Sequence, residues 1–297
     1  MTRKTAADYH PEVLRLFDLF VHGLADRRTF LDGAKKFAVG AGGAAALLEE
    51  LRPDFAAAEQ VKKDDPRIKA KTIEVKSPDG NGVVKGYFVE PADRGDRKLP
   101  TVLVIHENRG LSPHIEDIAR RLALDGFIAF APDALTPLGG YTGDEDKARE
   151  LFPKLDQTKT RADFIAALGA LKTCPIGNGK VGAVGFCYGG TVVNYLATKT
   201  ADLAAGVPFY GAAPAAEDVK NIKASLLLNF AGADDRINAG WPAYEAALKA
   251  AGVRYEAFVY PGVQHGFNND TTPRFDAPAA KLAWERTIAF FNAQLRA

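Results

Sequence analysis

The chain has 297 residues, of which 47% are hydrophobic and 25% are charged. This composition is typical of a globular protein and excludes a disordered, collagenous or coiled-coil chain. The 38 Lys and Arg residues nearly balance the 37 Asp and Glu residues, which leaves a net charge of +1. No broad positive field therefore attracts nucleic acid. No apolar run reaches the roughly 18 to 20 residues that span a bilayer, so we expect neither a nucleic-acid nor a membrane partner.

Residues 1–64 form a predicted N-terminal helical extension. The sequence DRRTFL at 26–31 precedes a Gly- and Ala-rich run at 37–48, and this pattern resembles a twin-arginine export signal. The two arginines lie far from Met1, however, and Glu49 and Glu50 end the apolar run early. The alternative is a pair of amphipathic helices. The apolar residues that recur at helical spacing are Val13, Leu14, Leu16, Phe17, Phe20 and Val21.

The two interpretations of the extension predict different locations and contacts. Amphipathic helices would pack on the main domain or on a second subunit, and a homodimer formed through them is one expectation. In that case the protein stays in the cytoplasm. A degenerate but working twin-arginine signal would instead send it to the periplasm. We favour the helical interpretation.

Residues 65–297 form a predicted α/β domain. Two runs at 72–75 and 83–89 flank the turn PDGNG at 78–82, which favours an antiparallel hairpin. Apolar runs then alternate with helical segments, which indicates βαβ units in a doubly wound, mostly parallel sheet covered on both faces. The predicted strands are 102–105, 128–130, 181–184, 205–207, 226–230 and 255–259. The predicted helices are 115–124, 161–171, 191–198, 243–251 and 278–295, with Pro278 in the first turn of the last.

The most informative motif is Gly185-Phe186-Cys187-Tyr188-Gly189-Gly190, which joins a predicted strand to a predicted helix. It has the form of a nucleophile elbow with cysteine in the serine position. The strained turn needs glycines two residues before and after the nucleophile, where side chains would collide. The helix N-terminus also favours the thiolate, which is the form that attacks carbonyl carbon. We predict that Cys187 is the nucleophile and that Cys174 is a small core residue.

An elbow requires an acid and a histidine downstream, each on a loop after a later strand. The spacing Gly-x-Asp-x-x-Ile favours Asp234 as the acid, and its neighbour Asp235 is the alternative. With Asp234 as the acid, Asp235 is expected to cap the next segment or to pair with Arg236. His265 is the only histidine after Cys187. We therefore predict the catalytic triad Cys187, Asp234 and His265.

Acyl transfer also needs two backbone N–H donors for the oxyanion. Tyr188, directly after the nucleophile, supplies the first in our prediction. Asn108, on the loop after the strand at 102–105, supplies the second. His106 begins the same loop and is expected to brace its backbone.

These motifs together resemble the dienelactone hydrolase family, the carboxymethylenebutenolidases of α/β-hydrolase fold. The resemblance rests on GFCYGG at 185–190, HENRGL at 106–111, GADDRI at 232–237 and QHGF at 264–267, and it covers roughly residues 68–296. It implies an α/β-hydrolase fold and a Cys-Asp-His triad that needs no cofactor and no metal. By position, it also implies that Glu107 lies beside the cysteine and helps to control its protonation.

The substrate-binding residues depart from the family pattern. Dienelactone hydrolases hold the substrate carboxylate with arginines, one of them four residues beyond the catalytic histidine, and this chain has Asn269 there. Arg109, Arg274 and Lys147 are the candidate replacements, and Tyr141 is a candidate for the mouth of the pocket.

The function favoured by these patterns is a cysteine-dependent hydrolase of small-molecule esters or lactones that forms a thioester acyl-enzyme. One alternative is a general carboxylesterase or acyl-transfer enzyme with the same triad. Another is a non-catalytic ligand-binding protein of α/β-hydrolase fold, because the fold alone does not guarantee activity. A third is redox sensing by Cys187.

Overall fold

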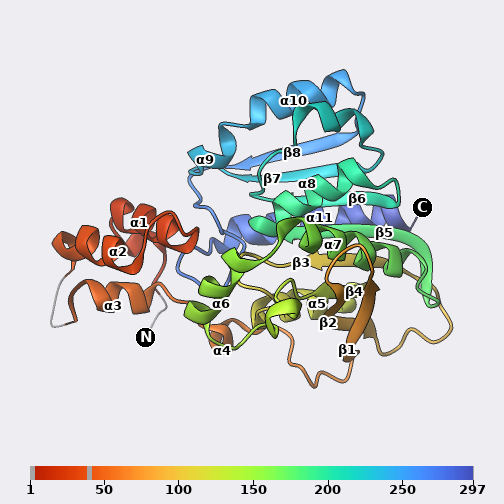
Figure 1. Ribbon diagram of the computed structural model, residues 1–297, viewed down its shortest axis with the longest axis horizontal. Coiled ribbons are helices and arrows are strands. Elements are labelled where there is room, and N and C mark those ends of the chain that lie inside the picture. Colours follow the sequence, from red (N-terminus) through yellow and green to blue (C-terminus); the bar gives the residue numbers. More distant parts are fainter. Residues whose placement is uncertain (1–3, 39–41, 297) are drawn as a thin grey trace.

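The computed structural model describes residues 4–38 and 42–296. Its described strands form one sheet in the order β1-β2-β4-β3-β5-β6-β7-β8, shown in Figure 1. β1 pairs antiparallel with β2 and β2 with β4, whereas the other neighbours are parallel. The strands are β1 (Ile68–Ser77), β2 (Gly82–Pro91), β3 (Leu99–Ile105), β4 (Ile128–Pro132), β5 (Gly177–Phe186), β6 (Leu203–Phe209), β7 (Ser225–Ala231) and β8 (Tyr255–Tyr260). The predicted sheet, opened by an antiparallel hairpin, is confirmed.

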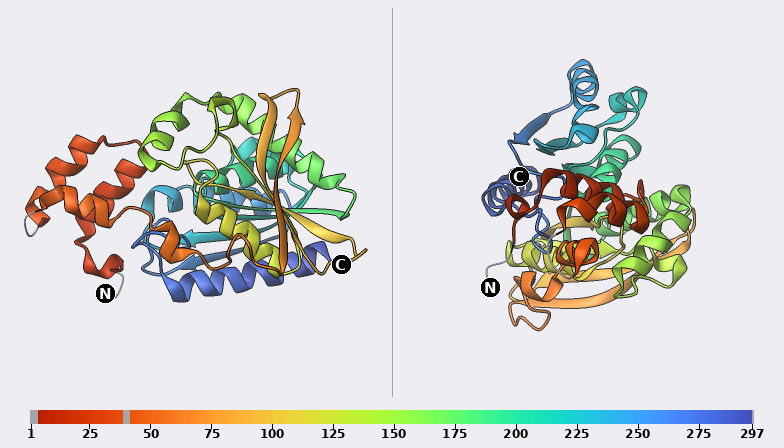
Figure 2. Two further views of the ribbon diagram at one scale, coloured as in Figure 1. Left: turned by 90° about the horizontal axis from the view of Figure 1, so that it is seen from below. Right: turned by 90° about the vertical axis from the view of Figure 1, so that its left-hand side faces the viewer.

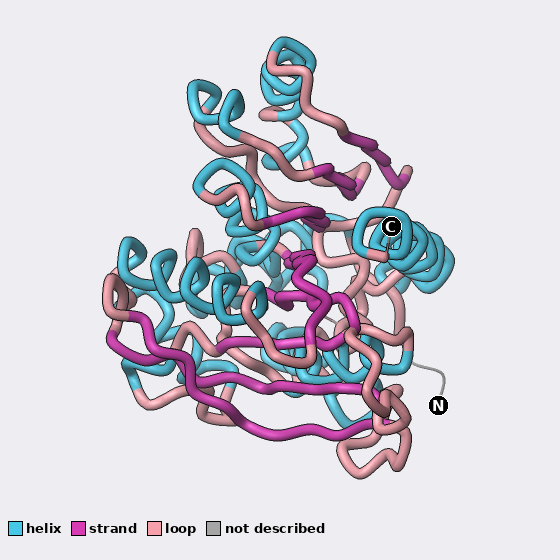
Figure 3. Tube along the Cα trace, turned by 90° about the vertical axis from the view of Figure 1, so that its right-hand side faces the viewer, coloured by secondary structure: helices cyan, strands magenta, loops and turns pink. Residues whose placement is uncertain are grey.

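Helices cover both faces of this sheet, as the end-on view in Figure 3 shows. The α-helices of the sheet domain are α5 (Pro113–Leu124), α6 (Glu145–Leu151), α7 (Gln157–Lys172), α8 (Tyr188–Lys199), α9 (Asp235–Asn238), α10 (Trp241–Ala250) and α11 (Ala277–Leu295). Short 3-10 turns lie at η3 (Thr136–Leu138), η4 (Phe152–Lys154) and η5 (Ala216–Asn221). All five predicted helices are present, and Pro278 lies in the first turn of α11.

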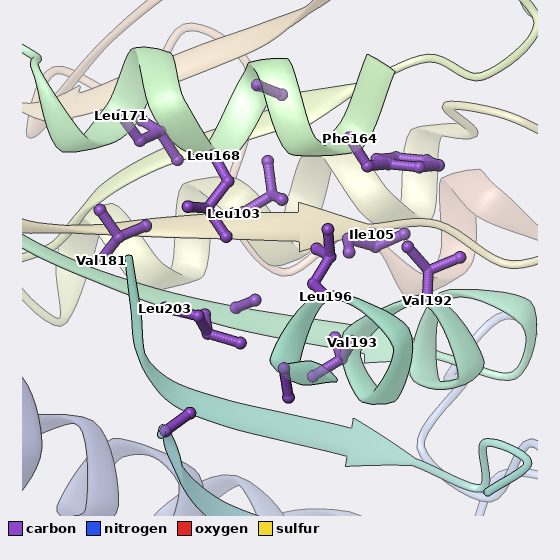
Figure 4. Packing of buried hydrophobic residues seen from close by; sticks show 14 of the residues in the cluster. Leu103, Ile105, Phe164, Leu168, Leu171, Val181, Val192, Val193, Leu196 and Leu203 are labelled. Atoms are coloured by element: carbon purple, nitrogen blue, oxygen red, sulfur yellow. The ribbon is translucent and has the colours of Figure 1, made fainter. Parts of the chain in front are cut away.

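Two hydrophobic clusters fill the space between the sheet and its helices. One joins the sheet to α7, α8 and α10, and the other joins it to α5 and α11. In Figure 4, Leu168 of α7 faces Leu103 of β3, and Leu196 of α8 lies near Ile105 at the end of the same strand. β3 is buried along its whole length, which agrees with its apolar sequence on both faces. This packing holds the carboxyl ends of β3 and β5 rigidly side by side.

The N-terminal helices have a core of their own. They are η1 (Ala6–Asp8), α1 (Pro11–Val21), α2 (Arg27–Ala34), η2 (Lys35–Phe37), α3 (Gly43–Glu50) and α4 (Phe55–Ala58). Figures 1 and 2 show α1, α2 and α3 together at one end of the molecule. The buried residues of this cluster include Val13, Leu14, Leu16, Phe17, Phe20, Phe30 and Leu48. The apolar spacing read from the sequence thus corresponds to the buried face of α1.

The residues that resemble an export signal are helical as well. Asp26 caps α2 by accepting a hydrogen bond from the Thr29 N–H at 2.7 Å, and Arg27 and Arg28 are exposed in the first turn. Of the Gly- and Ala-rich run at 37–48, residues 39–41 lie outside the described residues, and the run continues into α3. Within the described ranges, no helix is both long and apolar enough to cross a membrane.

Candidate active site

Cys187 lies between the end of β5 and the start of α8, in a backbone conformation that side chains rarely adopt. Its φ is 56° and its ψ is −111°. Among the described non-glycine residues, only Cys187 and Tyr210 have a positive φ. The Cys187 N–H donates to the Phe209 carbonyl oxygen at 3.0 Å, which ties the turn to the neighbouring strand. This strained turn is what a nucleophile elbow requires.

The glycines on either side of Cys187 are needed because backbones meet there. A Cβ atom on Gly189 would lie 2.2 Å from the Ile105 carbonyl oxygen, and one on Gly185 would lie 2.2 Å from the Gly189 carbonyl oxygen. Neither neighbour is a flexible side chain that can turn away. The elbow therefore tolerates no side chain at either position.

We expect Gly189→Ala to destabilise the protein strongly, because its Cβ atom can be accommodated only if α8 moves away from β3. The measurement is thermal unfolding. Gly169→Ala is the matched control, because Gly169 lies within α7 and a Cβ atom there meets nothing within 4 Å. That change should leave the melting temperature unchanged or raise it. Equal melting temperatures for the two variants would contradict the close approach.

His265 and Asp234 form a buried pair on the loops after β8 and β7. The His265 Nδ1–H donates to Asp234 Oδ2 at 2.5 Å. A ring nitrogen of His265 lies within 4.8 Å of Cys187 Sγ. The structure thus brings together the three residues predicted as the triad, in the geometry of an acid that orients a histidine near a nucleophile.

The predicted capping role of Asp235 is wrong. Asp234 itself is the N-cap of α9, where its Oδ1 accepts a hydrogen bond from the Ile237 N–H at 3.3 Å. Asp235 is the first residue of the helix and is exposed. An N-cap side chain turns back over the first helical turn, whereas the next side chain points outward. Asp234 therefore holds α9 with one carboxylate oxygen and His265 with the other.

His106 is buried and has a partner at each ring nitrogen. Its Nδ1–H donates to the Glu107 carbonyl oxygen at 2.5 Å, and its Nε2 accepts from the Ala134 N–H at 3.0 Å. Burial lowers the pKa of His106, so the ring is neutral. Both contacts brace the loop after β3, as the sequence predicts, and leave no nitrogen for catalysis.

The two predicted oxyanion donors lie on different segments, Tyr188 directly after Cys187 and Asn108 on the loop after β3. Tyr188 begins α8, where the first N–H groups have no partner within the helix. Its side chain points elsewhere, because its hydroxyl donates to Gln157 Oε1 at 2.9 Å. Asn108 lies on the loop after β3, and its Nδ2 donates to the Val21 carbonyl oxygen at 2.8 Å. The N–H groups of both residues stay predictions as oxyanion donors.

Sequence reasoning missed one residue of the site, His22, which directly follows α1. His22 Nε2 lies 3.3 Å from Cys187 Sγ, and the rings of His22 and His265 meet edge to face at 4.8 Å. The His22 Nδ1–H donates to the Asp18 carbonyl oxygen at 2.7 Å, and Asp18 Oδ1 lies 3.3 Å from the same nitrogen. The only local signal was an acid and a histidine four residues apart, on one face of a helix.

Two imidazoles therefore act on the thiol. Burial raises the pKa of Cys187, but His265 and His22 outweigh burial and hold it at about 6. Burial lowers the pKa of His22, whereas the hydrogen bond to Asp18 and the charge of the Cys187 thiolate raise it to about 10. The pKa of His265 is raised against its burial by Cys187 and Asp234. The arrangement favours a thiolate beside a protonated imidazole.

Cys187, His22 and His265 are residue types that bind zinc, and their donor atoms lie within 4.8 Å of one another. The Arg236 guanidinium, with Nη2 3.3 Å from His22 Nε2, opposes a cation at this position. The absence of a metal stays a prediction.

A small cavity of about 60 Å³ lies where α1 meets the loop after β3. It is lined by Glu107, Arg109, Asn269 and Arg274, among others, whereas Tyr141 lies outside it. It is smaller than typical ligand pockets of about 300–1,000 Å³, and Cys187, His22 and His265 are not among its lining residues. Lys147 is exposed and is not among the residues that line the cavity.

The predicted substrate-binding residues are already engaged with other protein groups. Arg109 Nη2 donates to the Val21 carbonyl oxygen at 2.9 Å. Arg274 Nη1 donates to Asp18 Oδ1 at 3.3 Å. Asn269 Nδ2 donates to Glu107 Oε2 at 2.8 Å. The predicted contact between Glu107 and the cysteine stays a prediction.

Two family models match the chain. Residues 84–295 match the model described as "Dienelactone hydrolase family", and residues 1–40 match a model described as "YqhI-like". The second match is separate from the first and falls within the predicted extension.

Curated relatives and a solved structure agree with the first match. The "Putative hydrolase fragment YghX" of Escherichia coli is 52% identical over 115 residues, which are 39% of this chain and 97% of that protein. A "Putative carboxymethylenebutenolidase" of Synechocystis is 31% identical over 77% of this chain and 99% of its own length. A crystal structure titled "Putative Dienelactone Hydrolase", from Klebsiella pneumoniae, is 26% identical with a TM-score of 0.65, over 75% of this chain and 98% of that chain.

Proposed function

The chain belongs to the dienelactone hydrolase family, and we propose that it hydrolyses small-molecule esters or lactones through a thioester on Cys187. Membership confirms the predicted family, the α/β-hydrolase fold and the enzyme class, a hydrolase that acts on ester or lactone bonds. The proposal for the mechanism rests on one observation. Cys187 stands on a strained elbow within reach of His265, which Asp234 holds at 2.5 Å.

In this mechanism, Cys187 Sγ attacks the carbonyl carbon, and the bond to the alcohol oxygen then breaks. The backbone N–H groups of Tyr188 and Asn108 stabilise the oxyanion that forms on the way. His265 exchanges protons with the thiol and activates the water that hydrolyses the thioester. Asp234 fixes the His265 ring with Nδ1 protonated, so that Nε2 faces the reaction.

The cavity contacts favour neutral esters over lactones that carry a carboxylate. Arg109 and Arg274 are the candidate carboxylate partners, but both donate to the N-terminal segment, and the family's arginine is replaced by Asn269. A carboxylate substrate would have to displace these contacts and desolvate the guanidinium groups. A carboxylesterase of broader substrate range is therefore the second candidate.

The test is stopped-flow hydrolysis of 4-nitrophenyl acetate. We expect a burst of nitrophenol equal to the enzyme concentration, followed by slower turnover, because the alcohol leaves before the thioester is hydrolysed. A carboxylate-bearing enol lactone, compared under the same conditions, should give the lower kcat/KM. No turnover of either substrate would favour a ligand-binding protein instead.

We further propose that the N-terminal segment remains in the mature protein, which works in the cytoplasm. Cleavage after the signal-like run would remove His22 from the thiol, to which it lies at 3.3 Å. Cell fractionation combined with the intact mass of the recovered protein tests this: the full-length mass in the cytoplasmic fraction is expected, and a shortened periplasmic form would contradict it. Association into a homodimer through these helices stays a prediction that light scattering checks.

A further inference from the structure

We propose that His22, carried into the active site by the N-terminal segment, is a second catalytic histidine that holds Cys187 as a thiolate and protonates the leaving alcohol. The inference rests on the proposed function for its second half, because the leaving alcohol belongs to the hydrolytic reaction. Its first half, the thiolate pair, rests on geometry alone.

The hydrogen bonds of His22 determine where its protons lie. A carbonyl oxygen can only accept, so the 2.7 Å contact with the Asp18 carbonyl oxygen places a proton on Nδ1. Nε2 then faces Cys187 Sγ at 3.3 Å and Arg236 Nη2 at 3.3 Å. A guanidinium has no acceptor, so only the sulfur can accept a proton carried by Nε2. His265 repeats the arrangement, with Nδ1–H on Asp234. The nucleophile thus has two acid–histidine pairs, and one of them comes from outside the sheet domain.

Asp18 is in turn held by the sheet domain. Arg274 is buried, its Nη1 donates to Asp18 Oδ1 at 3.3 Å, and its guanidinium lies over the Phe17 ring at 5.2 Å from the ring centre. At the end of α1, the Val21 carbonyl oxygen accepts from both Asn108 and Arg109. These contacts hold α1 against the sheet domain. Since His22 directly follows α1, they also fix the position of His22 next to the thiol.

The surrounding charges act in both directions. Asp18 favours the charged His22, whereas Arg236 of α9, with Nη2 3.3 Å from Nε2, opposes it. Arg236 is exposed, so solvent screens its charge more than that of the half-buried carboxylate. The other groups that interact electrostatically with the thiol are His265, which is paired with Asp234, and Arg109 and Tyr210. Glu107 acts on both Arg109 and Tyr210 in turn, and Arg274 acts on Tyr210. His22 is the one cation partner of the thiol that comes from the N-terminal helices among the described residues.

The proton balance of the cycle closes with both histidines. The thiolate sulfur bonds to the carbonyl carbon, and the C–O bond breaks with its electron pair leaving on the alcohol oxygen. Protonated His22 gives its Nε2 proton to that oxygen and becomes neutral. His265 then takes a proton from water as the water oxygen bonds to the carbonyl carbon, and the C–S bond breaks to restore the thiolate. That proton returns from His265 to His22 by way of Sγ, which both rings approach.

The test is the pH dependence of alkylation of Cys187 by iodoacetamide, followed by mass spectrometry in a buffer with EDTA. Only the thiolate reacts, so the rate rises with pH through the pKa of the thiol, which is about 6 in the intact protein. In His22→Gln we expect the midpoint to rise by at least about one pH unit, toward the ordinary value of about 8.5. The plateau rate above pH 9 reports access to the thiol and separates a loss of charge pairing from a displaced helix.

His10→Asn is the matched control. His10 lies at the other end of the same helix, where it caps α1 by accepting from the Glu12 N–H at 3.1 Å, and asparagine can replace that cap. Its midpoint should equal that of the wild type. Asp18→Asn should raise the midpoint of alkylation as His22→Gln does. Asp18→Glu keeps a carboxylate, so its midpoint should lie between those of Asp18→Asn and the wild type.

The outcomes separate this inference from the proposed function. A midpoint that does not move in His22→Gln overturns the inference, even if the wild type forms an acyl-enzyme. A midpoint that moves in His22→Gln but not in His10→Asn supports the thiolate pair, even if no ester is hydrolysed. A burst of alcohol that slows at least about tenfold in His22→Gln supports the role in protonating the leaving group.

Discussion

Replacing Cys187 with alanine should abolish hydrolysis, with kcat/KM reduced by a factor on the order of 10⁵ to 10⁶, as for the loss of a nucleophile in other triads. The structure gives the reason. His265, proposed to activate water, has a ring nitrogen within 4.8 Å of Sγ, and alanine leaves nothing at the Sγ position to form the acyl bond. The measurement is the steady-state rate with an aryl ester.

Cys174→Ala is the matched control for this change. Cys174 is the other free cysteine, it is partly buried, and it packs against the hydrophobic core near α7. Its replacement should leave kcat/KM within about twofold. Equal activities of the two variants would exclude a cysteine nucleophile on the elbow and would leave Cys187 as a redox-sensitive or structural residue.

Replacing Asp234 with asparagine should lower kcat by about 10² to 10⁴, because the amide no longer holds His265 with Nδ1 protonated. The change has little effect on folding, since asparagine is also a good N-cap and Asp234 caps α9. Asp235→Asn serves as the comparison, because Asp235 is exposed in the first turn of the same helix. Its activity should stay close to that of the wild type.

The pH profile adds a second readout for the Asp234 variant. The carboxylate of Asp234 raises the pKa of His265 by stabilising its charged form. Without that charge, His265 stays neutral to lower pH. The limb of the pH–rate profile that reports the pKa of His265 should therefore move to lower pH. A larger loss of activity in Asp235→Asn than in Asp234→Asn would show that the triad acid is misassigned.

Much of the fold could be predicted because the strands are covered on both faces. β3, β4 and β7 are buried along their entire length, so each reads as an unbroken apolar run in the sequence. The hairpin of β1 and β2 was equally clear, because its turn is rich in glycine. The elbow was predictable for a related reason, since its glycines are required by backbone contacts that any such turn must make.

The parts that could not be predicted depend on contacts between distant segments. His22 and Cys187 are 165 residues apart, and no local pattern indicates that the end of α1 reaches the thiol. The sequence showed that α1 has an apolar face, but an apolar face does not say which end of the helix meets a partner. The hydrogen bond that Arg109 donates to the Val21 carbonyl oxygen could not be predicted for the same reason.

The assignment of the acid shows the limit of spacing arguments at short range. The spacing favoured Asp234 over Asp235, and Asp234 is the residue found on His265. The sequence does not show where the helix begins to within one residue, so the prediction that Asp235 caps the helix is wrong by one position. The difference of one position matters, because the side chain of Asp234 is buried and that of Asp235 is exposed.

The measurement that tests the central claim most directly is mass spectrometry of the wild-type protein quenched during turnover of 4-nitrophenyl acetate, followed by peptide mapping. The account predicts one added acetyl group, located on the peptide that contains Cys187, removed by hydroxylamine and absent from Cys187→Ala. An acetyl group on another residue, or turnover at the wild-type rate without any adduct in rapidly quenched samples, would contradict a covalent cysteine mechanism.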